Sequence, residues 1–256
     1  MSGKHGFDHR HLHVHGTSPL HRLAPEAKLA GLLAFVIVVA LTPRQWIAAF
    51  ALDAAIATAL VVVARLPPRL VIARLTAITP FVAFALFLPF LGDGDTIDIA
   101  SFSLSVDGLW ASWNILAKAG LGALASILVT ATTPIPDLLS GLSRLRIPTA
   151  IVGILGFMFR YLDLVVDDLT RMRRAMAARC YNPRWLWQSR PIASSAGALF
   201  VRTYERGERV HHAMAARGYA GRMPDLDRRA GTHYDWALAA APALVAVVGV
   251  AALALA

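Results

Sequence analysis

The residues best placed to do chemistry are two arginines that end two copies of one motif. Ala-Met-Ala-Ala-Arg-Cys-Tyr at 175–181 returns as Ala-Met-Ala-Ala-Arg-Gly-Tyr at 213–219, with six identities in seven positions. A guanidinium group stays charged when it is partly buried, and its planar fork can bind a carboxylate through two hydrogen bonds. Two matching arginines therefore predict that the chain binds two equivalent acidic pockets. An ordinary helix stop would explain one copy, but not the repeated arginine and tyrosine.

Each copy stands at the end of a predicted helix whose apolar residues form a narrow seam. The first seam consists of Ile151, Leu155, Met158, Leu162, Val165, Leu169, Met172 and Met176. The second, on a helix from about residue 192, consists of Leu199, Thr203, Val210 and Met214. The next seam positions are Arg179 and Arg217, so both arginines are expected on the face that packs. Met172, Met176, Val210 and Met214 are expected to support them.

The residues that follow each arginine are typical of helix ends. An arginine in the last turn meets the negative end of the helix dipole and the free carbonyl groups there. Gly218 suits a left-handed residue after the second helix, and Asn182-Pro183 prevents the first helix from continuing.

The composition predicts an all-α integral membrane protein. Hydrophobic residues make up 57% of the chain and charged residues 16%, with long runs that carry no charge. The net charge of +9 is expected to mark loops that stay in the cytoplasm, and not nucleic-acid binding, because the chain has no soluble fold to carry it. The single cysteine excludes an intrachain disulfide framework.

About five transmembrane helices are expected, at 29–41 (beginning near residue 26), 46–64, 71–91, 109–133 and 236–256. Pro80 predicts a kink or a break in the third of them. The chain then divides into a polar His-rich arm (1–22), a four-helix transmembrane part (23–133), a cytoplasmic domain with the two motif-ended helices (134–230) and a C-terminal transmembrane helix (231–256).

The charges predict an orientation in the membrane. Between residues 160 and 229 there are fourteen arginines, no lysine and seven acidic residues, which favours the cytoplasmic side. The loop at 92–98 carries three aspartates and no base, so it is expected outside. Five spans with the N-terminus inside satisfy both conditions. A sixth span at 148–166 would break this parity, and its apolar run meets Arg160 too early to cross a bilayer.

These features resemble a known family. The paired motifs on helices expected in the cytoplasm resemble the signature of the transmembrane T component of energy-coupling factor (ECF) transporters, and the chain is most similar to the cobalt-type, CbiQ-like members. Ser-Pro-Leu-His-Arg-Leu-Ala-Pro-Glu-Ala-Lys-Leu at 18–29 resembles the family's entry to its first span. Arg-Ile-Pro at 146–148 and Phe-Arg-Tyr at 159–161 resemble the segment that leads into the first coupling helix. The resemblance covers residues 18–256.

The resemblance implies a role in the bacterial or archaeal cytoplasmic membrane. Two ABC-type ATPase subunits, which hold ATP and magnesium, would each accept one motif-ended coupling helix. This chain would transmit their movement to a separate, CbiM-like substrate-binding S component, with a small accessory membrane subunit as a further candidate partner. The expected groove-binding residues are Ala178, Arg179, Cys180, Ala216, Arg217 and Gly218. Cys180 departs from the family's glycine, so the first helix is open to a different ending.

The resemblance also implies a non-catalytic subunit without a cofactor of its own, with cobalt as the transported substrate. No Gly-x-x-x-x-Gly-Lys-Ser/Thr loop is present, so this chain is not the ATPase. Nickel, biotin and other vitamins stay open as alternative substrates, because a coupling subunit need not touch its cargo. A lipid anchor built on the arginine-rich block is a further alternative; it predicts binding that weakens gradually with each charge removed.

A metal site is a second reading of the N-terminal arm. Five histidines, four of them at alternate positions, are compatible with chelation of cobalt, nickel, copper or zinc; they are His5, His9, His11, His13 and His15. A polar tail with incidental metal affinity explains the same pattern, and no metal ligand is assigned to this chain. The alternative is a membrane-bound metal-handling protein that needs residues 1–16.

Two ionisable residues, Asp53 and Lys118, lie inside predicted spans, where such groups face protein or water. They are expected to form structural pairs or to line a partner interface. No arrangement of residues in the chain indicates catalysis.

Overall fold

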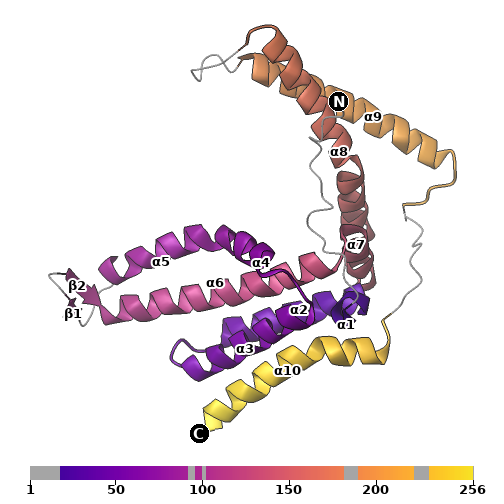
Figure 1. The fold of residues 1–256 in the computed structure, drawn as a ribbon. Helices are drawn as coiled ribbons and strands as arrows, with labels where there is room; N and C mark the ends of the chain where they lie inside the picture. Colours follow the sequence, from indigo (N-terminus) through magenta and orange to yellow (C-terminus); the bar gives the residue numbers. More distant parts are fainter. Residues whose placement is uncertain (1–17, 92–95, 100–101, 182–189, 222–230, 256) are drawn as a thin grey trace. The chain divides into compact units, whose positions relative to one another are not determined.

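The structure is a computed structural model that describes residues 18–91, 96–99, 102–181, 190–221 and 231–255 (Figure 1). Its helices are α1 (Pro19–Arg22), α2 (Pro25–Leu41), α3 (Ile47–Val63), α4 (Pro68–Leu75), the 3-10 turn η2 (Thr76–Ile78), α5 (Thr79–Leu91), α6 (Val106–Thr132), α7 (Ile135–Arg144), α8 (Thr149–Ala178), α9 (Arg190–Ala215) and α10 (His233–Leu255). The prediction of an all-α membrane protein is confirmed.

One short hairpin interrupts the helices. Strands β1 (Thr96–Ile99) and β2 (Phe102–Ser105) pair antiparallel, with Thr96 opposite Ser105. They lie between α5 and α6, and only residues 96–98 of β1 fall within the loop at 92–98 that the sequence analysis expected outside the membrane. The sequence analysis did not predict this hairpin, because four-residue strands are too short for their alternation to be distinguished from a polar loop.

The described residues fall into two compact units. The first, here called the bundle unit, contains residues 18–145 and 231–255, that is α1 to α7, the hairpin and α10. The second, the two-helix unit, contains residues 146–221 with α8 and α9. The chain passes from the bundle unit to the two-helix unit between Leu145 and Arg146, and it returns between residues 221 and 231.

The bundle unit exposes apolar side chains, as a protein dissolved in lipid does. Large residues that are more than half exposed include Leu33, Ile37, Phe84, Leu86, Phe87 and Val248. Such an apolar surface on a soluble protein would be a single patch of a few hundred Å², whereas here it extends over several helices. Its small core is formed by two clusters of buried residues, one around Phe35 and Phe50 and one around Leu66 and Ala131.

Four helical segments of the described residues are long and apolar enough to cross a membrane: 68–90, 106–132, 149–178 and 233–254. Helix α3 is apolar but shorter, and α2 has the same length of 17 residues. The predicted spans at 29–41 and 46–64 correspond to these two shorter helices, and the added segment is α8, which the sequence analysis placed in the cytoplasmic domain. Its first half is apolar and its second half carries the charges, so length and composition alone admit it as a span.

The helix breaks follow from proline chemistry. The predicted break in the third span occurs as the 3-10 turn Thr76–Ile78, just before Pro80. A proline ring lacks the N–H that would bond to the residue four positions earlier and clashes with that carbonyl group. At the other end of the chain, residues 19–22, which were assigned to the polar arm, form the short helix α1, which begins at Pro19.

Candidate partner-binding site

The first copy of the repeated motif forms a Schellman cap at the end of α8. Cys180 has a φ of 59°, in the left-handed region. The backbone N–H of Tyr181 donates to the carbonyl of Met176 at 3.1 Å, and that of Cys180 donates to Ala177 at 3.0 Å. These two bonds satisfy carbonyl groups that the last helical turn leaves without donors.

The second copy ends α9 in the same way. Gly218 has a φ of 80°. The N–H of Tyr219 donates to Met214 at 3.0 Å, and that of Gly218 donates to Ala215 at 3.0 Å. The replacement of glycine by Cys180 in the first copy therefore does not alter how the helix ends. The two motifs are equivalent in backbone geometry as well as in sequence.

The residues predicted for the partner grooves are all exposed. Arg179 and Arg217 are both exposed, and so are the other four residues predicted for partner grooves: Ala178, Cys180, Ala216 and Gly218. An exposed alanine precedes each arginine, so each helix end presents one long cationic side chain beside small residues.

The seam predicted on α9 is the face that packs. The side chains of α9 that are partly covered are Ser195, Leu199, Thr203, Arg206, Val210 and Met214. Their spacing of three and four residues defines one stripe along the helix. The seam predicted on α8 is covered only in part: Leu155, Leu162, Val165, Met172 and Met176 are partly covered, whereas Ile151, Met158 and Leu169 are exposed. Arg217 therefore continues the stripe that packs, one turn beyond the last covered residue.

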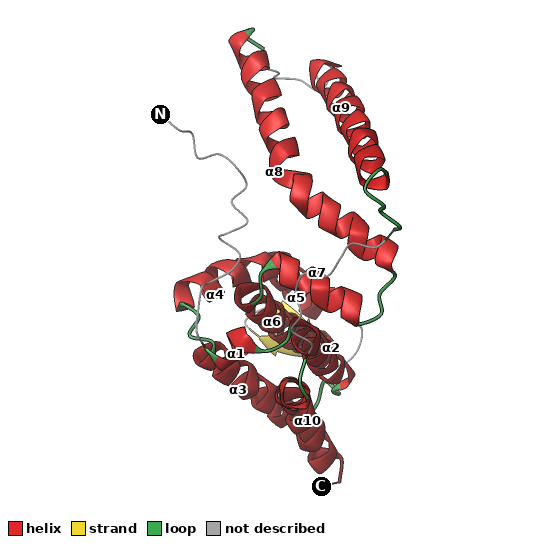
Figure 2. Cartoon of the chain, turned by 90° about the vertical axis from the view of Figure 1, so that its right-hand side faces the viewer, coloured by secondary structure: helices red, strands yellow, loops and turns green. Residues whose placement is uncertain are grey.

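Helices α8 and α9 pack antiparallel, and Figure 2 shows them side by side. The hydroxyl of Ser195 contacts the sulfur of Met176 at 3.7 Å, and Arg206 forms an ion pair with Asp168 at 3.2 Å. Residues later in α9 therefore lie beside residues earlier in α8. Arg217 lies 22 residues beyond Ser195, about 33 Å along the helix at 1.5 Å per residue. The two motifs are thus at opposite ends of the pair.

The two-helix unit leaves large apolar side chains uncovered. Neither α8 nor α9 has a fully buried residue. The large apolar residues that are exposed include Ile154, Met158, Leu169, Phe200, Val201 and Tyr204. Surfaces of this kind mark contacts with a partner protein or with lipid.

The sequence analysis assigned no role to the charged start of α2. Residues 24–28 are all buried, and they include Glu26 and Lys28. The Lys28 ammonium donates to the Thr133 hydroxyl at 3.1 Å and to the carbonyls of Thr132 and His21 at 3.4 Å each. Glu26 accepts hydrogen bonds from Arg144 and from the backbone of Gly231. Only the resemblance at 18–29 marked this segment.

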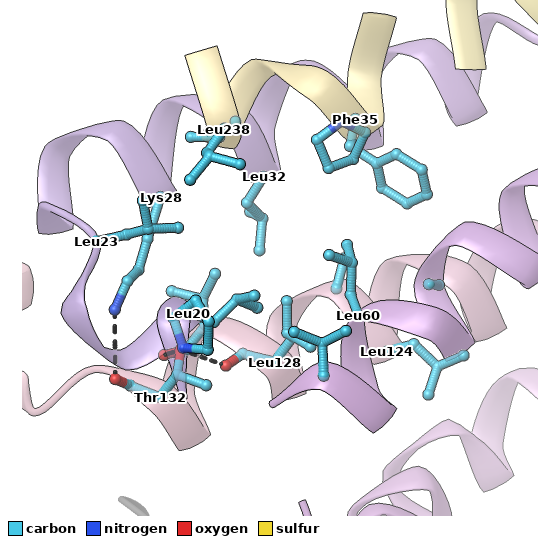
Figure 3. Close-up of a pocket in the computed structure, with 18 residues that line it drawn as sticks. Leu20, Leu23, Lys28, Leu32, Phe35, Leu60, Leu124, Leu128, Thr132 and Leu238 are labelled. Carbon is cyan, nitrogen blue, oxygen red and sulfur yellow. Dashed lines mark hydrogen bonds between the residues drawn. The ribbon is translucent and has the colours of Figure 1, made fainter. Parts of the chain in front are cut away.

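A cavity of about 280 Å³ lies beside Lys28, between α1, α2, α3, α6 and α10. Figure 3 shows Leu32, Phe35, Leu60 and Leu128 among the side chains that line it. Among the described residues, its lining contains no histidine, cysteine, methionine or carboxylate, which are the side chains that bind transition metals. Most of the residues that line it are apolar.

The two intramembrane charges do not pair with each other. Lys118 donates to the carbonyl of Ala40 at 2.7 Å, in the last turn of α2, where carbonyl groups lack helical donors. Asp53 is 1% exposed, and neither carboxyl oxygen has a hydrogen-bond partner among the described residues. The described residues contain no cluster of three or more metal-binding side chains. The histidines of the arm at 5–15 lie outside the described residues.

Fold and site together define a class: a multi-pass α-helical membrane protein that carries two equivalent arginine-tipped helices. Comparisons with known proteins place it within that class. The family model CbiQ, described as cobalt transport protein, matches residues 16–226. The chain belongs to this family of ECF transporter T components.

Three relatives illustrate the similarity. The chain is 26% identical over 223 residues to the energy-coupling factor transporter transmembrane protein EcfT of Listeria innocua, covering 82% of this chain and 83% of that one. It is 35% identical over 101 residues to the cobalt transport protein CbiQ of Rhodobacter capsulatus, covering 38% and 40%. It is 27% identical over 214 residues to a putative fused cobalt transport protein CbiMQ of Methanocorpusculum labreanum, covering 80% of this chain and 36% of that relative.

Proposed function

We propose that this protein is the coupling subunit of an ATP-driven importer, and that Arg179 and Arg217 dock into two ATPase subunits. The observation that carries the proposal is the equivalence of the two helix ends. Both end in the same Schellman cap, both expose one arginine, and both arginines continue a packing seam. Two copies of one ATPase would offer two identical binding pockets, and the two equivalent helix ends would each fit one of them.

The spacing of the motifs supports two separate partners. Antiparallel packing of α8 and α9 places Ser195 beside Met176, one turn before Arg179, and Arg217 about 33 Å from Ser195 along α9. One socket could not hold both. The arginine side chain suits the task because its fork binds carboxylates in a fixed orientation, so a movement of the socket is transmitted to the helix.

We propose cobalt as the transported substrate, bound by a CbiM-like S component and not by this chain. The family description and the name of the fused relative, which joins CbiM and CbiQ, support this assignment. The apolar lining of the cavity favours a metal site on another subunit. Uptake of cobalt, nickel and biotin by cells that express the complete complex distinguishes cobalt from the alternative substrates.

The docking proposal is tested by charge reversal. Arg179→Glu, Arg217→Glu and the double variant are co-purified with the ATPase subunits, and ATP hydrolysis is measured. We expect each single variant to weaken association and the double variant to lower the recovered ATPase by at least about tenfold, as for an interface residue of the strongest class. Arg174→Glu and Arg202→Glu are matched controls, because these arginines are exposed on the same two helices.

Undiminished association of the double variant would show that the repeat serves the structure of the two helices. A gradual loss that the control variants share would favour binding to an anionic surface through total charge. Loss confined to the two seam arginines, with the membrane protein still folded, would establish docking.

A further inference from the structure

The start of α2 is the most densely buried part of the bundle unit. Five successive residues, 24–28, are buried, whereas in the rest of α2 only Phe35 and Val39 are buried. Two of the five carry charge, and charges are buried in proteins when they hold other groups in place. The segment lies within 18–29, the stretch that the proposed docking function leaves without a role.

The carboxylate of Glu26 joins two segments that are far apart in the sequence. Its Oε1 and Oε2 accept from Nη1 of Arg144 at 3.3 and 3.5 Å. The same Oε1 accepts from the backbone N–H of Gly231 at 2.7 Å. Glu26 is 4% exposed, so these bonds are shielded from water.

The surrounding backbone packs too closely for a larger residue. A Cβ atom on Gly141 of α7 would lie 3.0 Å from the backbone nitrogen of Glu26. A Cβ atom on Gly231 would lie 3.1 Å from Oε1 of Glu26 and 3.2 Å from the indole nitrogen of Trp236. Glycine at both positions lets α7 and the start of α10 approach the carboxylate.

Lys28 fixes the other side of the same segment. Its ammonium holds the carbonyl of Thr132 and the hydroxyl of Thr133, at the end of α6 and just before α7 begins. The start of α2 thus ties together the end of α6, the end of α7 and the approach to α10.

These contacts coincide with the two points at which the chain changes unit. The chain leaves the bundle unit after Leu145, one residue beyond Arg144, and Gly231 is the first described residue after it returns. One buried carboxylate therefore bonds to a residue next to each of the two connections, within the bundle unit. Any movement that passes along the chain from the two-helix unit to the bundle unit enters at these two connections.

We infer that Glu26 is a positioning residue that transmits movement of the two-helix unit to the membrane helices, by holding Arg144 and Gly231 together. This inference rests on the proposed coupling function. It makes a separate prediction: loss of the anchor should leave docking of the ATPase subunits intact and should uncouple ATP hydrolysis from transport.

The test uses the complete complex reconstituted in vesicles, with cobalt(II) uptake and ATP hydrolysis measured together. Glu26→Gln keeps the size of the side chain and an acceptor for Gly231 but removes the charge that pairs with Arg144. Arg144→Met removes the other partner, and Arg144→Lys keeps its charge. Arg44→Met is the matched control, since it breaks the Arg44–Asp107 ion pair of 2.9 Å, which is exposed and lies away from both connections.

We expect Glu26→Gln and Arg144→Met to retain the ATPase subunits and to lower cobalt uptake per ATP hydrolysed by at least about tenfold. Arg144→Lys should recover most of the coupling ratio, and Arg44→Met should not change it. A purely structural role would lower protein yield and both activities in parallel, leaving the ratio unchanged.

An unchanged ratio in both Glu26→Gln and Arg144→Met would overturn the inference, and so would loss of the ATPase subunits from these variants. If Glu26→Gln does not accumulate in the membrane, the comparison of Arg144→Met with Arg144→Lys decides the question. Failure of the proposed function itself would appear differently, as a wild-type protein that recovers no ATPase.

Discussion

At the scale of single residues, Cys180 is a non-glycine residue in a backbone conformation that favours glycine. It adopts the left-handed conformation at a φ of 59°, which the second copy gives to Gly218 at 80°. A Cβ atom in this conformation lies close to the following carbonyl oxygen and costs roughly 1–2 kcal/mol. Part of that cost is offset because glycine loses more conformational freedom on folding. The first helix end is therefore expected to be the weaker of the two.

Cys180→Gly should stabilise the last turn of α8 by about 0.5–1 kcal/mol. Amide hydrogen exchange at residues 179–181 measures this, and protection should rise by about two- to fivefold. Gly218→Cys is the reciprocal variant and should lower protection at the end of α9 by a similar factor. Equal protection of both caps in the wild type would contradict the argument.

At the scale of the helices, close packing depends on small residues. A Cβ atom on Gly31 of α2 would overlap the backbone carbonyl oxygen of Ala239 on α10. A Cβ atom on Gly108 of α6 would lie 2.5 Å from the carbonyl oxygen of Leu88 on α5. Helices in membranes associate through such close approach, because lipid provides no hydrophobic force between them. The α2–α10 and α5–α6 pairs are therefore specified by single glycines.

Gly31→Val should force α10 away from α2 and lower the free energy of unfolding by about 1–3 kcal/mol. Thermal unfolding in detergent measures this change. Gly120→Val on α6 is a matched control, because nothing lies within 4 Å of a Cβ atom there. A control that destabilises the protein as much as Gly31→Val would show that valine itself, and not the crossing, is responsible.

At the scale of the whole molecule, the open point is the side of the membrane on which each segment lies. Five spans with the N-terminus inside would place the two-helix unit in the cytoplasm, on the side of the proposed ATPase subunits. Helix α8 is long and apolar enough to be a span by composition. If α8 crossed the membrane, its end at Cys180 would lie on the outer face. The position of this one residue therefore decides between the two topologies.

Cys180 is a natural reporter, because it is the single cysteine of the chain and is exposed. A membrane-impermeant maleimide should label it in inside-out vesicles and not in right-side-out vesicles. In the proposed complex, the ATPase subunits should then protect it. Gly218→Cys in a Cys180→Ser background is the control at the second helix end. Labelling of Cys180 from the outer face would exclude the cytoplasmic assignment.

What the sequence by itself determined was local and periodic. The helices and the break before Pro80 follow from apolar runs and proline chemistry, and the α9 seam from spacing of three and four residues. The repeat at 175–181 and 213–219 located both helix ends and carried the resemblance to the family. These features were predictable because each depends on neighbours within one or two helical turns.

Only the tertiary structure decided which distant groups meet. Glu26 bonds to residues 118 and 205 positions away, and Lys28 to residues 104 and 105 positions away. No periodicity in the chain encodes these partners, since they follow from how the helices pack. The antiparallel order of α8 and α9, which sets the motifs at opposite ends, was likewise absent from the pattern. Local chemistry formed the two arginine-ended helices, whereas tertiary packing formed the contacts of Glu26 within the bundle unit.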